Sequence, residues 1–201
     1  MEVRMGKIYC IMGKSASGKD TIYKELLKQD KVKLQTLVTY TTRPIREGEK
    51  DGVEYFFSNE EELEKLISGH KVIEIREYNT MHGVWKYFTV DDGRLDLENH
   101  SYIFIGTLES YLKLRDYYGK EVLVPIYINL DDGLRLNRAL MREQQQEKPR
   151  YAELCRRFLA DEEDFSKNKL EDAEVLMQFE NDDLDAALDQ IVEFMVQSQG
   201  E

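Results

Sequence analysis

Two periodicities of hydrophobic and polar residues alternate along the chain. Short apolar runs are typical of buried strands, and stretches with apolar residues every three or four positions are typical of helices. The runs predict core strands at 7–12, 35–40, 101–105, 121–130 and 175–179. The helical pattern covers 20–29, 59–68, 109–118, 131–146, 151–166 and 182–197. Strands separated by helices indicate βαβ units, so we predict an α/β fold with a parallel core sheet flanked by helices.

The region 41–90 interrupts this rhythm. It begins with a polar loop, 41–52, that contains proline and glycine, and a short strand is predicted at 55–57. Two further segments, 72–78 and 85–90, alternate apolar and polar residues as half-exposed strands do. We therefore predict that a small, mostly β lobe is inserted into the α/β core.

Composition narrows the possible partners. The 201 residues include 28 Lys and Arg against 40 Asp and Glu, a net charge of −12, which argues against nucleic-acid and anionic-membrane partners. No stretch approaches the roughly 20 apolar residues that span a bilayer, so we expect a soluble cytoplasmic protein. Cys10 and Cys155 have no metal-binding or redox spacing, and we expect both to be buried thiols. An anionic ligand would require basic residues concentrated at one site.

The segment 13–20 has the pattern of a phosphate-binding loop (P-loop), because it follows a predicted strand and opens a predicted helix. Its glycines allow backbone N–H groups to surround phosphate oxygens, and Lys19 would neutralise the β- and γ-phosphates. The predicted ATP-binding residues of this loop are Gly13, Lys14, Ser15, Ala16, Ser17, Gly18, Lys19, Asp20 and Thr21. The pattern has a hydroxyl residue after the lysine to bind Mg²⁺. Asp20 stands there, with Thr21 next, and the sequence leaves open which of the two faces the ion.

A second group of charged residues follows in the polar loop. Arg43 and Arg46 flank Pro44, and two arginines at this spacing would converge on one phosphate. Glu49 would hold an arginine in place. On spacing alone, a solvated polar loop is the favoured interpretation.

The segment 38–57 resembles the acceptor-binding segment of guanylate kinases, with Thr-Thr-Arg at 41–43 and Tyr-Phe-Phe at 55–57. The resemblance extends unevenly over nearly the whole chain. It implies that Arg43, Arg46 and Tyr55 bind the phosphate of GMP. It also implies that Thr39 contacts the base and that Glu74 accepts hydrogen bonds from guanine N1 and N2.

The resemblance also assigns residues in the C-terminal half. Arg138, Arg142 and Arg157 match the lid arginines that close over the phosphates, and the first two lie one helical turn apart. Asn181 would lie near the adenine of ATP, although a helix cap would also account for it. Other arginines compete for the lid role: Arg135, Arg150 and Arg156.

The sequence departs from the family pattern in two places. His82-Gly83 stands nearest to the family's Tyr-Gly pair, and His82 would donate to a phosphate or be structural. The family's D-x-D after the next core strand is absent. The sequence there is Gly106-Thr107-Leu108-Glu109, in which Thr107 or Glu109 would only partly substitute.

Together these patterns predict a single guanylate-kinase-like domain over 1–201 with the P-loop kinase fold. Its core would comprise about 1–40, 100–134 and 168–201, its acceptor lobe about 41–92 and its helical lid about 135–167. The predicted activity is phosphorylation of a nucleoside monophosphate by ATP and Mg²⁺, with GMP the favoured acceptor. The alternatives are a related kinase with another acceptor, such as a deoxynucleotide or a phosphorylated sugar, and a non-catalytic binding module. Neither oligomeric state nor regulation follows from the sequence.

Overall fold

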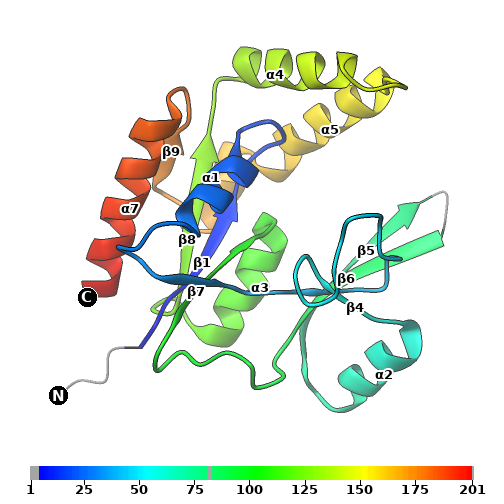
Figure 1. Cartoon of the computed structure of the whole chain (residues 1–201), viewed down its shortest axis with the longest axis vertical. Coiled ribbons are helices and arrows are strands. Elements are labelled where there is room, and N and C mark those ends of the chain that lie inside the picture. The colour runs from blue at the N-terminus through cyan, green and yellow to red at the C-terminus, as the bar shows by residue number, and fades with distance from the viewer. Residues whose placement is uncertain (1–4, 81–82, 201) are drawn as a thin grey trace.

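The core is a five-stranded sheet in which every pair of neighbouring strands is parallel. A computed structural model describes residues 5–80 and 83–200. In spatial order the core strands are β2 (Leu34–Thr36), β7 (Ser101–Ile105), β1 (Ile8–Met12), β8 (Leu123–Asn129) and β9 (Gln178–Glu180). Figure 1 shows this sheet flanked by helices. The predicted α/β fold class is therefore confirmed.

The central strand β1 is fully buried, and its side chains alternate between the two faces of the sheet. Tyr9 and Ile11 pack in one hydrophobic cluster with α1 (Lys19–Leu26) and α7 (Leu184–Gly200). Ile8, Cys10 and Met12 pack in the other cluster, with α3 (Leu108–Tyr118) and α6 (Lys167–Asp172). Because both faces are covered, this strand is apolar throughout, and the sequence signal for it was correspondingly clear.

The inserted lobe has a separate four-stranded sheet. Its strands, in spatial order, are β4 (Phe56–Phe57), β3 (Tyr40–Thr41), β6 (Gly83–Val90) and β5 (Val72–Thr80). Helix α2 (Glu60–Ser68) covers this sheet, with Leu63 buried against Phe88 and Val90. Asn59 caps the helix as predicted, since its side chain accepts a hydrogen bond from the Glu62 amide at 2.9 Å.

Two long helices, α4 (Asp132–Gln144) and α5 (Tyr151–Asp164), cover most of the segment predicted to be a lid. In Figure 1 they project from the core on the same side as the β5–β6 hairpin of the lobe. Glu143 holds the turn between them, because its buried carboxylate accepts hydrogen bonds from the Arg150 amide and from Gln146. The α4–α5 pair and the lobe therefore both extend from the same side of the core.

Several local predictions are wrong. The predicted strand 35–40 is divided between β2 and β3, which belong to different sheets, because the chain leaves the core here to enter the lobe. The last core strand begins at Gln178, three residues later than predicted, and helix α6 was not predicted at all. Cys10 is buried as expected, but Cys155 is exposed on α5.

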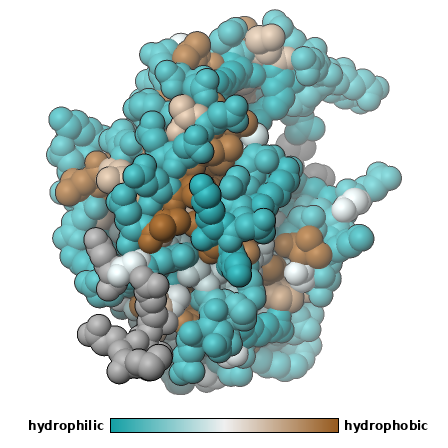
Figure 2. Space-filling view, turned by 60° about the vertical axis from the view of Figure 1, so that its left-hand side comes forward, coloured by the Kyte–Doolittle hydropathy of each residue, from teal (hydrophilic) through white to brown (hydrophobic). Residues whose placement is uncertain are grey.

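Hydrophilic residues cover most of the face shown in Figure 2, in keeping with the excess of acidic side chains. Within residues 5–80 and 83–200, no helix is long and apolar enough to cross a membrane.

Candidate functional site

The P-loop connects β1 to α1 in the conformation that its glycines allow. Gly18, immediately before the helix, has a φ of 90°, and Ala16 has a φ of 62°. A Cβ atom on Gly18 would lie 2.1 Å from the Asn181 side-chain nitrogen, so only glycine fits there. Backbone N–H groups at the start of α1 are therefore available to an anion.

Asn181 lies beneath this loop. It follows β9, is only 4% exposed, and its Nδ2 donates to the Ser17 carbonyl at 2.7 Å. Arg138 of the lid donates to the Asn181 carbonyl at 3.3 Å. Asn181 thus supports the P-loop from below, which the sequence did not indicate. Its assignment to the adenine of ATP remains a prediction.

Asn181→Asp tests this support, because aspartate has the same shape but its ionised side chain has no donor for the Ser17 carbonyl. We expect a loss of about 2 kcal/mol in the free energy of unfolding, which lowers the Tm by about 4–8 °C. Differential scanning fluorimetry with and without ATP measures both this loss and the remaining nucleotide stabilisation. Asp185→Asn, on the exposed first turn of α7, is the control. An unchanged Tm in Asn181→Asp would exclude the supporting role.

A network of charged side chains joins the P-loop to the lid. Arg135 is 1% exposed and donates to Asp132 at 2.8 Å, to Glu162 at 2.7 Å and to the Ser15 carbonyl at 3.2 Å. Lys14 pairs with the same Glu162 at 2.7 Å. Arg135 is therefore an internal connector of α4, α5 and the P-loop, rather than a free lid arginine.

Asp161 of α5 contacts the P-loop directly. Its carboxylate accepts a hydrogen bond from the Ser15 amide at 2.7 Å, and amides of this loop are the donors that would bind phosphate. A phosphate that used the Ser15 amide would have to displace Asp161. An anion bound at this amide would therefore be coupled to the position of α5.

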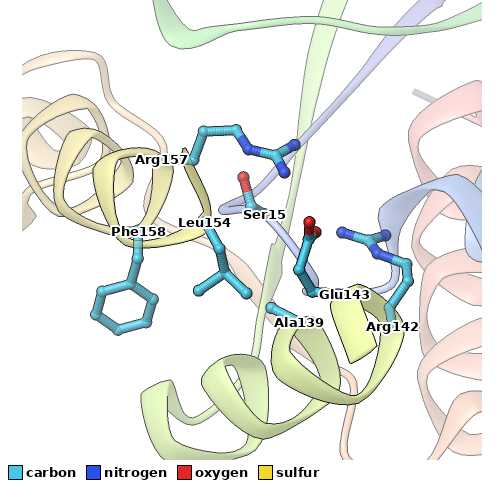
Figure 3. Close-up of a pocket in the computed structure, with 7 residues that line it drawn as sticks. All are labelled: Ser15, Ala139, Arg142, Glu143, Leu154, Arg157 and Phe158. Atoms are coloured by element: carbon cyan, nitrogen blue, oxygen red, sulfur yellow. The ribbon is translucent and has the colours of Figure 1, made fainter. Parts of the chain in front are cut away.

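Two of the predicted lid arginines lie beside the same P-loop residue. Arg142 of α4 and Arg157 of α5 line a pocket with Ser15, and Figure 3 shows Ser15 between them. Both side chains are exposed. Of the competing candidates, Arg156 pairs with Glu153 at 2.7 Å on the exposed face of α5, and Arg150 follows the interhelical turn. The structure thus brings Arg138, Arg142 and Arg157 together around the P-loop.

Arg43 is buried, with only 3% of its surface exposed. Glu49 holds its guanidinium through two hydrogen bonds, at 2.8 and 2.9 Å, and also accepts one from the Arg46 amide at 2.7 Å. The hydrogen bonds from Arg43 keep the pKa of Glu49 below its usual value. The Arg43 Nε is buried and has no hydrogen-bond partner among the described residues, which is unusual for a buried donor.

Three tyrosines extend from Arg43 towards the core. The Arg43 guanidinium carbon lies 5.4 Å from the centre of the Tyr55 ring, and Tyr55, Tyr87 and Tyr78 follow at successive ring distances of 5.5 Å. The sequence indicated only Tyr55. Tyr78 and Tyr87 were missed because alternation along β5 and β6 explained them as ordinary strand residues.

Two other residues predicted to bind the acceptor, Thr39 and Arg46, lie beside the cluster of Arg43 and the tyrosines. Thr39 is half-buried and its carbonyl accepts from the Phe56 amide, and Arg46 is exposed above the Trp85 ring. His82 lies outside the described residues.

Glu74 is buried, as expected for a residue that reads a base in a closed pocket, but its carboxylate already has partners. Arg76, two residues along β5, donates to its two oxygens at 2.9 and 3.2 Å, and Thr89 donates at 2.8 Å. The sequence analysis did not single out Arg76. The signal was its spacing of two from Glu74, which places both side chains on one face of the strand.

The chain is tightly packed just after β7. A Cβ atom on Gly106 would lie 2.7 Å from Cys10 Sγ and 2.9 Å from Ser110 Oγ, so a side chain at this position would clash with its neighbours. Thr107 caps α3, since its hydroxyl accepts from the Ser110 amide. Glu109 lines the neighbouring cleft.

A cleft of about 710 Å³ lies between the P-loop, the lobe and the lid. Gly13 and Lys19 line it from the P-loop, Tyr78 from the acceptor lobe, Asp161 from α5 and Lys169 from α6. Its volume suits a small-molecule ligand. It is the place where a group bound at the P-loop and a group bound by the lobe would meet.

The donor set for a magnesium ion is sparse. Asp20 and Thr21 are both exposed at the start of α1. Over the described ranges, no group of three or more His, Cys, Asp or Glu side chains is arranged to hold a metal ion. An exposed carboxylate beside the P-loop fits Mg²⁺ that takes its other ligands from phosphates and water.

The fold is that of a P-loop kinase. It combines a parallel sheet of this strand order with a P-loop after the central strand, a pair of helices in the predicted lid segment and an inserted β lobe. The guanylate kinase family model matches residues 5–87. A guanylate kinase of Bacillus cereus is 41% identical over 78 residues, 39% of this chain and 38% of that protein. One from Oceanobacillus iheyensis is 30% identical over 139 residues, 68% of this chain and 65% of that protein. Over these segments the chain is similar to guanylate kinases.

The fold extends the similarity beyond these segments. The crystal structure of guanylate kinase from Anaplasma phagocytophilum superposes with a TM-score of 0.65 at 22% identity, over 98% of this chain and 88% of that one. This match supports the fold of the C-terminal half. The sequence alignment with the Bacillus cereus enzyme, however, spans only about two fifths of that protein's length.

Proposed function

We propose that this protein transfers the γ-phosphoryl group of ATP to a nucleoside monophosphate, with GMP as the acceptor. The observation that carries the proposal is the shared cleft. Lys19 of the P-loop lines it on one side and Tyr78 lines it on the other, at the end of the series of rings that begins at Arg43. One site thus offers a place for a triphosphate and a place for a second phosphate.

In the proposed mechanism the protein orients two phosphates and neutralises their charge. Lys19 and the lid arginines Arg138, Arg142 and Arg157 would stabilise charge on the phosphoryl group in transfer. Arg43, Arg46 and Tyr55 would hold the acceptor phosphate in line with it. No general base is needed, because the attacking phosphate oxygen is already ionised near neutral pH.

The proposed metal ion is Mg²⁺, held by Asp20, with Thr21 as the neighbouring candidate ligand. When bound, it would supply additional positive charge to the ATP phosphates. Asp20 would contact it directly or through water, since a carboxylate is a suitable hard-oxygen ligand.

A coupled assay of ADP release over a panel of acceptors tests the proposal. We expect GMP or dGMP to be phosphorylated with a kcat/KM at least about tenfold above that of AMP, CMP and UMP, because a buried polar site rejects a base that leaves it unpaired. Phosphorylated sugars serve as the alternative acceptors. A panel in which no guanine nucleotide is preferred would contradict the assignment of GMP.

The intact P-loop favours an enzyme over a binding module. Lys19 and the glycines of the loop are all present, and the lid arginines surround them. If ATP with Mg²⁺ gives no thermal stabilisation, the binding-module alternative becomes the better account.

A further inference from the structure

The hydrogen-bonding capacity of Glu74 is nearly exhausted inside the protein. An ionised carboxylate accepts at about four lone-pair positions, two on each oxygen. Arg76 Nη2 and Thr89 both donate to Oε1, and Arg76 Nε donates to Oε2. One position remains, on Oε2. Two donors of a base, such as N1–H and N2–H of guanine, would each need an oxygen, and Oε1 has no position left.

Arg76, by contrast, has unused donors. A guanidinium has five N–H groups, of which Arg76 directs two to Glu74. Within 5–80 and 83–200, no residue accepts a hydrogen bond from the others. The side chain is 14% exposed, so it is partly buried and its unused N–H groups remain open to a ligand. A ligand with hydrogen-bond acceptors would satisfy them.

The position of Arg76 suits contact with an acceptor nucleotide. It is opposite Tyr87 in the β5–β6 register and lies on the same face of β5 as Tyr78, which lines the cleft. Its charge acts on the Tyr55 phenol and on the Cys10 thiol, so the guanidinium lies within electrostatic range of both the lobe and β1. Burial opposes its charge, but Glu74 outweighs this and raises the pKa of Arg76, so it remains a cation.

We propose that Arg76 is a specificity-determining residue that reads the O6 and N7 edge of a 6-oxopurine monophosphate. Arginine pairs with these two acceptors in a bidentate geometry. Glu74 holds the guanidinium in place and contributes little to recognition of the 2-amino group. The inference rests on the proposed function, because it names how that acceptor is selected.

Two nucleotide analogues separate the two edges of guanine. IMP lacks the 2-amino group but keeps O6 and N7, whereas 7-deaza-GMP lacks N7 but keeps N1–H and the amino group. We expect IMP to match GMP within about threefold in Kd and kcat/KM, and 7-deaza-GMP to be at least about tenfold weaker, the effect of one hydrogen bond to a charged group. AMP, which carries a donor in place of O6, should be weakest. Calorimetry measures Kd and the coupled assay measures kcat/KM.

The opposite pattern overturns the inference. If IMP is tenfold weaker and 7-deaza-GMP matches GMP, Glu74 reads the amino edge despite Arg76. If both analogues match GMP, Arg76 does not read the base. If no 6-oxopurine nucleotide binds, the inference is also wrong. Binding in the expected order without phosphorylation would leave the inference intact and contradict the proposed function.

Arg76→Ala provides the matched variant, because it frees the Glu74 carboxylate. In this variant we expect the order of the two analogues in Kd and kcat/KM to reverse. IMP should become about tenfold weaker than GMP, and 7-deaza-GMP should match GMP. Arg94→Ala removes a more exposed arginine that follows the lobe and pairs with Asp92, and this variant should retain the wild-type order of affinities. A folded Arg76→Ala with the wild-type order would contradict the inference. If Arg76→Ala does not fold, the comparison of GMP, IMP and 7-deaza-GMP on the wild-type protein still tests the inference.

Discussion

Lys19→Ala is expected to lower the turnover number with ATP and GMP by about 100- to 1,000-fold. Lys19 is the first residue of α1 and lines the cleft beside Gly13, where its ammonium group would face the transferring phosphoryl group. Removing one preorganised donor from developing charge has effects of this size. Steady-state measurement of ADP release at saturating substrates tests the expectation.

The control for this variant lies on the same helix. Lys24 is exposed, and Lys24→Ala should retain near-wild-type turnover. Near-normal turnover in Lys19→Ala would mean that the phosphate site lies elsewhere. Circular dichroism of both variants ensures that a lost fold is not mistaken for a lost catalytic group.

The largest effect on stability is expected from Arg135→Met. The side chain is 1% exposed and connects Asp132, Glu162 and the Ser15 carbonyl. Breaking a fully buried ion pair costs about 3–5 kcal/mol, and Asp132 and Glu162 keep some access to water, so we expect about 2–3 kcal/mol and a Tm lower by about 5–10 °C. Urea unfolding measures the free energy of unfolding directly.

An exposed ion pair of equal length is the matched control. Arg156 pairs with Glu153 at 2.7 Å on the outer face of α5, and both side chains are well exposed. Arg156→Met should therefore change the free energy of unfolding by less than about 1 kcal/mol. Equal losses in the two variants would contradict the role assigned to the buried network.

The stability difference between wild type and Arg135→Met should depend on pH. Burial raises the pKa of Asp132, but hydrogen bonding from Arg135 and the charge of Lys14 outweigh it, so the pKa is lowered. A carboxyl with a lowered folded-state pKa stabilises the fold above its unfolded value of about 3.9. That contribution is lost as the pH falls through the folded-state pKa. The free energies of unfolding of wild type and Arg135→Met should therefore converge as the pH falls below about 4.

The sequence and the fold agree best where local patterns are strong. The strand before the P-loop is buried on both faces, so it is apolar throughout and its position was predicted closely. The segment 35–40 has similar local character, but it divides between two sheets because pairing partners far away in the chain decide where each strand belongs. Local periodicity carries no information about such partners.

The candidate site was predictable to a similar degree. The P-loop pattern predicted a role for Lys19, and the resemblance to guanylate kinases predicted one for Arg43, because a phosphate-binding chemistry restricts residue types within one short segment. The sequence did not reveal that Asp161 contacts the Ser15 amide or that Asn181 supports the P-loop, since these contacts join residues more than a hundred positions apart.

The sequence by itself determined that this chain has a P-loop, a loop with two arginines at 41–52 and an α/β core, because each depends on short-range patterns of residue type. The tertiary structure alone decided which charges are free and which are occupied. Arg135 resembled a lid arginine and is a buried connector, and Glu74 resembled a free base-reading carboxylate and is held by Arg76. Such pairing depends on which side chains folding brings within hydrogen-bonding distance, and spacing along the chain does not specify it.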